Sequence, residues 1–131
     1  MKKLRFISFV PGILWFLLVL VLICLPKSDL PPLEGWGALL EKIHFDKWVH
    51  AGIFGVLALL FYIPFARTNI SKSEKNKIFA IITFLAMGWG FTTECIQIYI
   101  PGRSFDIADW AADSFGIVLI WVYAYKTWIR N

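Results

Sequence analysis

Charged residues are scarce in this chain. Of its 131 residues only 17% are charged, whereas 59% are hydrophobic; soluble domains carry about 25% charged residues. The composition excludes an intrinsically disordered chain, which requires low hydrophobicity and high charge. It also argues against an ordinary soluble domain, because so short a chain cannot bury this much apolar surface. A lipid bilayer is the natural solvent for such a sequence.

Cysteine is also rare, and this excludes a disulfide scaffold. Cys24 and Cys95 both lie inside long apolar runs, and we predict buried, inert packing thiols. Cys24 follows an apolar run, as a lipoprotein cysteine would, but bulky Ile23 precedes it where the lipoprotein peptidase requires a small residue. The sequence has no His/Cys metal signature, no nucleotide-binding loop and no G-x-S-x-G motif. No cofactor and no metal ligand are therefore assigned.

Long apolar runs dominate what remains. A membrane span needs about 20 apolar residues, and four segments qualify, at residues 6–25, 48–65, 78–100 and 107–125. None alternates with a period of two, which argues against a membrane β-barrel. The first segment follows a basic MKKLR but is long and lacks an A-x-A-like cleavage site, so we expect an uncleaved helix. The sequence predicts an all-α, integral-membrane four-helix bundle that forms a single domain over 1–131.

The positive charges predict the orientation. If the N-terminus is cytoplasmic, nine of the 13 Lys and Arg residues fall on the inner side, and four fall on the outer side. This asymmetry is the one found in membrane proteins, whose cytoplasmic loops are enriched in Lys and Arg. We therefore expect a multi-pass protein of the bacterial cytoplasmic (inner) membrane with both termini in the cytoplasm. The basic isoelectric point then requires no nucleic-acid partner.

The outer loop between the first two spans has a helical pattern of its own. Leu33, Trp36, Leu40 and Ile43 recur at helical spacing, and the preceding prolines can open a helix. A short amphipathic helix at the membrane interface is one interpretation. A plain tether is the other.

The intramembrane ionisable residues all fall in the outer half of the predicted bundle. Glu94 lies six residues before the outer end of the third span, and Asp113 lies six residues after the outer start of the fourth. Both are therefore about 9 Å below the surface at about 1.5 Å per residue. His50 lies just below the outer boundary of the second span.

These residues also fall on shared helix faces. The spacing places on one face each of three sets: Glu94 with Gln97, Asp46 with His50, and Asp106 with Asp109 and Asp113. An acid at mid-membrane costs about 2.5 to 3.5 kcal/mol, so we expect the three faces to turn inward and form one polar pocket open to the outside. Small residues at intervals of four favour close helix packing; they are Ala51, Gly55, Ala108, Ala112 and Gly116.

The turn before the last span has the residues of an anion site. Pro101 and Gly102 end the third span, and Ser104 or Asp106 can cap the next helix by accepting its free N–H groups. Arg103 stands beside that helix start. It either forms a salt bridge with Asp106 or binds a phosphate or carboxylate headgroup.

Several of the polar residues have two interpretations. Glu94 is a protonated acid bonded to Gln97 or a neighbouring helix, or it is a general base or metal ligand. His50 is an interfacial histidine bonded to Asp46 or a carbonyl, or a proton shuttle. Asp109 is a first-turn acid favoured by the helix dipole or a pocket carboxylate. The remaining three residues have one favoured role: Asp106 is a cap, Asp113 a pocket residue and Lys47 an interfacial anchor.

Two stretches of sequence resemble the VanZ-like family of small bacterial membrane proteins. They are DKWVH at 46–50 and ECIQIYIPGRSFDIADWAADSFG at 94–116. The second combines E-x-x-Q, P-G-R and D-x-x-D, and the resemblance covers roughly residues 44–120. The family pattern has Asn at the position of Asp113, so this chain places an additional negative charge, or a protonated acid, in the pocket. The resemblance implies an envelope membrane protein linked to teicoplanin or other glycopeptide resistance; it does not imply a reaction.

Two functions follow as hypotheses. In the first, the pocket binds a lipid headgroup, a lipid-linked wall precursor or a lipoglycopeptide, with ligand contacts from Gln97, Arg103, Asp106, Asp109 and Asp113. In the second, the protein is a membrane enzyme acting on a lipid-linked or phosphorylated substrate, with His50 and Glu94 as acid and base and the aspartates holding a metal ion. A proton- or ion-coupled carrier is a third reading, which would require an oligomer. Whether the protein is an enzyme, and how it oligomerises, stay open at this point.

Overall fold

The computed structural model describes residues 4–26, 37–42 and 44–130. Four helices in this part are long and apolar enough to cross a membrane, and they span Phe6–Cys24, Phe45–Ala66, Lys72–Gln97 and Ile107–Arg130. The all-α, four-helix membrane fold expected from the apolar runs is thereby confirmed. In detail the elements are η1 (Phe6–Phe9), α1 (Val10–Cys24), α2 (Gly37–Lys42), α3 (Phe45–Ala66), α4 (Lys72–Gln97), α5 (Ile107–Ala124) and η3 (Tyr125–Arg130).

The helix ends follow from local sequence. The Ser71 hydroxyl accepts the Glu74 N–H, and the Glu74 carboxylate accepts the Ser71 N–H, which forms a capping box. This cap lets α4 begin at Lys72, six residues before the apolar run that marked the predicted span. Gly102 has φ 74°, in the left-handed region that favours glycine, and its position allows the chain to turn after α4. Asp106 caps α5, as predicted.

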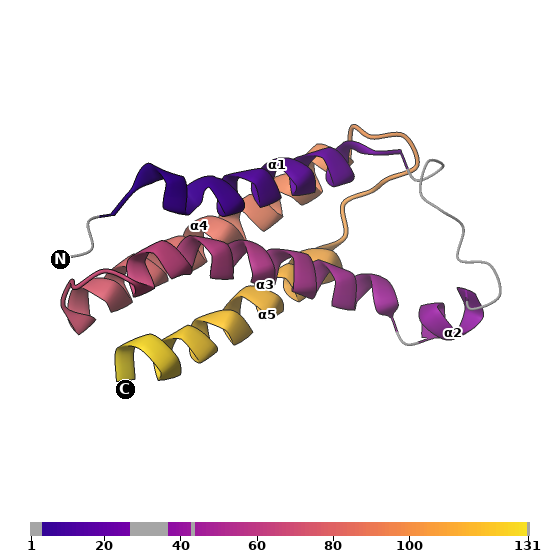
Figure 1. Cartoon of the computed structure of the whole chain (residues 1–131). Helices are drawn as coiled ribbons and strands as arrows, with labels where there is room; N and C mark the ends of the chain where they lie inside the picture. Colours follow the sequence, from indigo (N-terminus) through magenta and orange to yellow (C-terminus); the bar gives the residue numbers. More distant parts are fainter. Residues whose placement is uncertain (1–3, 27–36, 43, 131) are drawn as a thin grey trace.

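Helix α3 is the centre of the bundle. It packs most extensively against α5 and also contacts α4 and α1, while α1 lies against α3 and α4 (Figure 1). Two indole N–H groups tie helices together: Trp15 donates to the Ile53 carbonyl at 3.0 Å, and Trp110 donates to the Met87 carbonyl at 3.0 Å. The α3–α4 turn and η3 lie at one end of the bundle, and α2 and the α4–α5 connection lie at the other (Figure 1).

Small residues let α3 and α5 approach closely. A Cβ atom added at Gly116 would lie 1.9 Å from the Ala51 carbonyl oxygen, and one added at Gly55 would lie 3.2 Å from the Gly116 carbonyl oxygen. This is the close packing expected of small residues on membrane helices. The predicted stripe is shorter than its sequence spacing suggests, because Ala108 is exposed at the start of α5.

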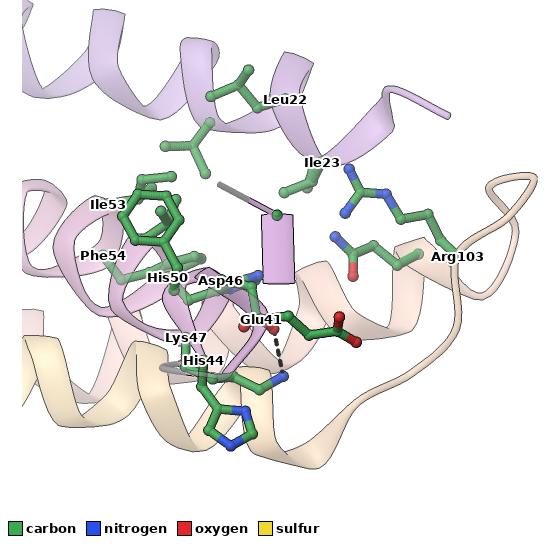
Figure 2. Close-up of a pocket in the computed structure, with 15 residues that line it drawn as sticks. Leu22, Ile23, Glu41, His44, Asp46, Lys47, His50, Ile53, Phe54 and Arg103 are labelled. Carbon is green, nitrogen blue, oxygen red and sulfur yellow. Dashed lines mark ion pairs between the residues drawn. The ribbon is translucent and has the colours of Figure 1, made fainter. Parts of the chain in front are cut away.

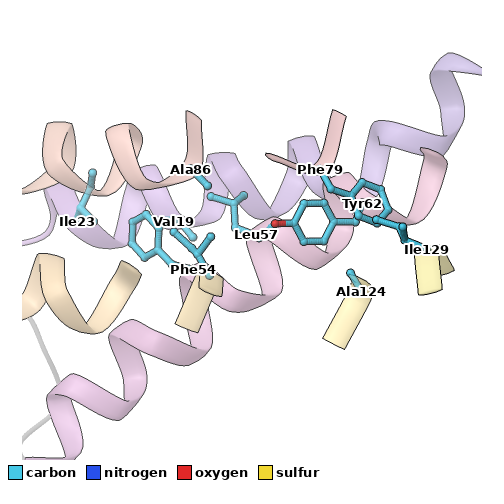
Figure 3. Close-up of a cluster of buried hydrophobic side chains, with 11 residues drawn as sticks. Val19, Ile23, Phe54, Leu57, Tyr62, Phe79, Ala86, Ala124 and Ile129 are labelled. Atoms are coloured by element: carbon cyan, nitrogen blue, oxygen red, sulfur yellow. The ribbon is translucent and has the colours of Figure 1, made fainter. Parts of the chain in front are cut away.

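The buried hydrophobic residues run along the bundle between the four helices (Figure 3). Towards the α3–α4 turn, the Tyr62 and Phe79 rings stack with centroids 4.6 Å apart. The Tyr62 hydroxyl lies 2.6 Å from the Thr83 hydroxyl. Both cysteines are free; Cys24 is exposed and Cys95 half-buried, so the prediction of buried packing thiols is wrong for Cys24.

A short helix, α2, lies between the first two spans, within the segment where an interfacial helix was one of two interpretations. Most of its proposed apolar face, Leu33, Trp36 and Ile43, lies outside the described residues. His44 follows with φ 51° and precedes the start of α3.

Candidate functional site: an ionic cluster and an adjoining cavity

Lys47, in the first turn of α3, organises one end of the bundle. Its ammonium group pairs with Asp46 at 3.1 Å, with Asp106 at 2.8 Å and with Asp109. The Lys47 side chain is 26% exposed, so these pairs are partly shielded from water. The sequence interpretation treated Lys47 as a simple interfacial anchor and missed this role. The sequence contained one indication of this role: Lys47 and His50 are three residues apart and therefore share a helix face.

His50 lies one turn deeper and joins α3 to α5. Its Nδ1 is 2.9 Å from Asp113 Oδ1, and its Nε2 is 3.6 Å from Asp109 Oδ2. Asp113 is 0% exposed, which places a carboxyl group in the interior of the bundle. Asp46, expected to touch His50, pairs instead with Lys47. Asp109 therefore serves both interpretations given above, as a first-turn acid and as a member of the cluster.

Glu94 brings α4 into the same cluster. Its side chain is 0% exposed, and its Oε2 accepts the backbone N–H of Asp106 at 2.9 Å. Glu94 thus fixes the point where the chain enters α5. Gln97, on the same face, is 3% exposed, yet the described residues form no Glu94–Gln97 hydrogen bond, so Glu94 bonds a neighbouring element instead.

Asp106 combines a local role with a long-range one. Its Oδ1 accepts the Ala108 N–H at 2.8 Å, and its Oδ2 accepts from the Lys47 ammonium. The Lys47 ammonium, followed by the Ala108 N–H, holds the pKa of Asp106 below its ordinary value of 3.8. The carboxylate is therefore ionised throughout the physiological range.

Arg103 lies in the connection between α4 and α5 and points towards α1 (Figure 2). Its Nε donates to the Leu25 carbonyl at 3.3 Å. Among the described residues no carboxylate lies within ion-pair distance of Arg103, so the alternative of an Arg103–Asp106 salt bridge is wrong. The guanidinium instead faces a cavity.

This cavity has a volume of about 760 Å³ and lies between α1, α3 and the α4–α5 connection (Figure 2). Its apolar lining includes Val19, Leu22, Ile23, Val49, Ile53 and Phe54. Its polar lining includes Glu41, Asp46, Lys47, His50, Gln97 and Arg103. Glu94 and Asp113 do not line the cavity; they lie behind His50 in the interior. The predicted single pocket is therefore divided into a lined cavity and a buried ionic cluster.

The buried part of the cluster has a donor set that could hold a metal ion. One ligand atom each from His50, Glu94 and Asp113 lie within 4.8 Å of one another. Imidazole and carboxylate groups are common ligands for divalent ions.

The helices and the cluster together define a multi-pass helical membrane protein with ionisable side chains buried at one end. The VanZ/LLP1 family model matches residues 9–129 of the chain, and the protein belongs to this family, as the two motif blocks indicated. No curated protein matches the chain, and no solved structure matches it.

Proposed function

We propose that this protein binds the anionic headgroup of a membrane amphiphile in the cavity between α1 and α3. The observation that carries the proposal is the position of Arg103, whose guanidinium faces a cavity that apolar side chains of α1 and α3 also line. A lipid headgroup, a lipid-linked wall precursor and a lipoglycopeptide share this chemistry, because each joins polar or anionic groups to a hydrocarbon chain.

The headgroup contributes most of the selectivity in this proposal. An acyl chain leaving the bilayer for the cavity gains little, because lipid tails are as apolar as Leu22 or Ile53. Charge-assisted hydrogen bonds from a guanidinium to a phosphate or carboxylate are stronger than neutral ones and are often bidentate. The energy of binding is therefore expected to depend on Arg103 more than on the hydrocarbon wall.

Lys47 is a weaker candidate for the same task. Its single positive charge already faces Asp46, Asp106 and Asp109, so the surroundings of Lys47 are net negative when these acids are ionised. A second anion would meet repulsion there. Arg103 lacks such carboxylate partners among the described residues, and this supports its assignment as the anion-binding group.

The test measures headgroup-dependent binding by the full chain in detergent micelles. Native mass spectrometry would compare phosphatidylglycerol with phosphatidylcholine of the same acyl chains. We expect preferential retention of phosphatidylglycerol, and we expect Arg103→Gln to weaken that retention by about tenfold, which corresponds to about 1.4 kcal/mol. Arg130→Gln, which removes the same charge at the other end of the bundle, serves as the matched control.

Two results would overturn the proposal. Equal retention of the two lipids would show that the headgroup is not recognised. An equal loss in Arg103→Gln and Arg130→Gln would mean that net charge, and not the cavity, attracts the anionic lipid.

We further propose that the cavity faces the outside of the bacterial cytoplasmic membrane and that both termini are cytoplasmic. The distribution of Lys and Arg supports this orientation, and cysteine labelling of Ser104→Cys and Ser71→Cys from either side tests it. Family membership and the amphiphilic cavity support a role in resistance to teicoplanin, a glycopeptide with an acyl chain. Expression in a susceptible host should raise the inhibitory concentration, and Arg103→Gln should abolish the increase.

A second candidate function is catalysis on a phosphorylated lipid. The observation that favours it is the His50–Asp113 pair, in which a buried carboxylate orients an imidazole that also lines the cavity. His50 would accept the proton of a water molecule attacking the phosphate, and the departing lipid alcohol would take a proton from water in the cavity. Glu94, which lies behind His50, would stabilise the protonated imidazole. Release of inorganic phosphate from a lipid phosphate, lost in His50→Gln but retained in His44→Gln, would establish this reading. Binding of the lipid phosphate without any turnover would favour amphiphile binding as the function.

A further inference from the structure

The buried part of the ionic cluster contains two carboxylate oxygens without partners. Glu94 Oε1 and Asp113 Oδ2 are buried and form no hydrogen bond within the described part of the chain. Both side chains are 0% exposed. A buried acceptor left unsatisfied costs about 1 to 3 kcal/mol, and more if it is charged, so two such atoms in one cluster require an explanation.

The two acids converge with His50, so that three side chains from three helices meet. His50 comes from α3, Glu94 from α4 and Asp113 from α5, and one ligand atom from each lies within 4.8 Å of the others. Gly90 makes room for this arrangement, because a Cβ there would lie 3.2 Å from Asp113 Oδ2. The three side chains are thus brought together by helix packing and not by neighbouring positions in the sequence.

We infer that His50, Glu94 and Asp113 form a binding site for a divalent transition-metal ion, with Zn²⁺ as the ion best suited to it. The ion would supply the missing partner of both orphan oxygens. Two ionised carboxylates, a neutral imidazole and a dication sum to zero charge, which is the least costly state for groups buried inside a membrane bundle.

The surroundings hold the three ligands as a metal site requires. Metal-binding side chains are commonly oriented by further hydrogen bonds to their remaining polar atoms. If His50 Nδ1 binds the ion, Nε2–H faces Asp109, 3.6 Å away, and Lys47 pairs with that aspartate. Glu94 Oε2 accepts the Asp106 N–H, which leaves Oε1 for the ion.

The donor set selects the class of ion. Imidazole suits Zn²⁺ and other transition metals better than Mg²⁺ or Ca²⁺, which favour all-oxygen sites. Three protein ligands leave a fourth position of Zn²⁺ open. Because His50 also lines the cavity, that position would be reached from the cavity side.

The experiment measures Zn²⁺ binding by the untagged full chain in detergent, stripped with chelator and then titrated with Zn²⁺ by calorimetry. We expect one equivalent per chain, with X-ray absorption showing nitrogen and oxygen ligands and no sulfur. His50→Gln, Glu94→Gln and Asp113→Asn should each weaken binding by about tenfold or more. His44→Gln and Glu74→Gln, which change the same residue types outside the ionic cluster, should bind Zn²⁺ as the unmodified protein does, and a Gln at position 74 can keep the capping box of α4.

The stoichiometry and the absorption spectrum of the unmodified chain decide the question even if a variant fails to fold. Binding well below one equivalent, or a spectrum with sulfur ligands, would overturn the inference. Equal weakening by Glu74→Gln and Glu94→Gln would also overturn it, since negative charge in general would then attract the ion. No lipid is added in this assay, so its outcome is independent of amphiphile binding.

Discussion

The two ends of the bundle bury polar groups in opposite ways. The end that we call the ionic end contains Lys47, His50, Glu94, Asp109 and Asp113. There Lys47 and His50 of α3 form ion pairs with Asp109 and Asp113, while Glu94 of α4 accepts the Asp106 N–H. Two of its carboxylate oxygens have no partner among the described residues. At the end that we call the aromatic end, Tyr62, Phe79 and Thr83 form a stacked and hydrogen-bonded group, and Lys75 donates to the carbonyl of Ala66 at 3.0 Å.

This difference separates residues that we expect to bind a ligand from residues that we expect only to stabilise the fold. Stacked rings and paired hydroxyl groups satisfy themselves, so the group formed by Tyr62, Phe79 and Thr83 needs no further ligand. The ionic end contains buried acids, which are costly inside a membrane and are usually functional. The comparison suggests that substitutions at the aromatic end should change the free energy of unfolding alone. Substitutions at the ionic end should change ligand or metal binding as well.

The largest effect is expected at Gly116, where the ionic end depends on close contact between α3 and α5. Gly116→Leu would force these helices apart, because even a Cβ atom would lie 1.9 Å from the Ala51 oxygen. We expect a loss of about 3 kcal/mol or more in the free energy of unfolding, measured in mixed micelles, together with loss of Zn²⁺ binding. Gly52→Ala is the control, since a Cβ at Gly52 meets nothing within 4 Å. Unchanged stability in Gly116→Leu would contradict the close packing.

A comparable loss of stability without loss of binding is expected at Phe79. Phe79→Ala removes a fully buried ring that stacks on Tyr62 and contacts Trp128, at a cost of about 3 kcal/mol. The folded fraction should still bind Zn²⁺ and anionic lipid as before. Altered binding in this variant would show that the two ends are coupled.

A smaller effect is expected at Lys47. Lys47→Met leaves Asp46, Asp106 and Asp109 without their shared cation, and we expect a loss of about 1 to 2 kcal/mol because the pairs are only partly buried. The pKa of Asp106 should rise towards 3.8, as measured by carbon-detected NMR. A lowered pKa stabilises the folded state above the unfolded value and loses that contribution as the pH falls through the folded value. The acid sensitivity attributable to Asp106, below pH 3.8, should therefore diminish in this variant.

The smallest effect is expected at Tyr62. Tyr62→Phe keeps the stacked ring and removes only the hydroxyl that lies 2.6 Å from the Thr83 hydroxyl. Interhelical hydrogen bonds in membrane proteins contribute about 0.6 kcal/mol on average, and Thr83 still donates to the Phe79 carbonyl. A loss above 2 kcal/mol would show that this hydroxyl pair is more than a local contact.

Much of the fold could be predicted from the sequence, because span length and helix caps are local properties. The four apolar runs located the four helices, and Asp106 capped α5 as its position before the run suggested. The prediction that the helix faces carrying His50, Glu94 and Asp113 turn inward and meet also agrees with their mutual distances. The two motif blocks contain the same residues, and the family that they resemble is the one whose model matches residues 9–129.

The contacts within the site could not be predicted from the sequence in the same way. Depth follows from counting residues along a helix, but the rotation of each helix about its axis depends on its neighbours. For this reason the ion pairs of Lys47 and the division between the cavity and the buried cluster were missed. Helix α1, which has no charge to mark a site, nonetheless provides part of the cavity wall.

The sequence by itself determined the number of spans and the caps of α4 and α5, because each depends on residues within a few positions of one another. Only the tertiary structure decided which oxygen faces His50, which acids pair with Lys47 and where Arg103 points. The contacts of Lys47 and His50 with the acids of α5 and its cap join residues about 60 positions apart. They depend on how closely small residues such as Gly116 allow α3 and α5 to approach, which no local pattern specifies.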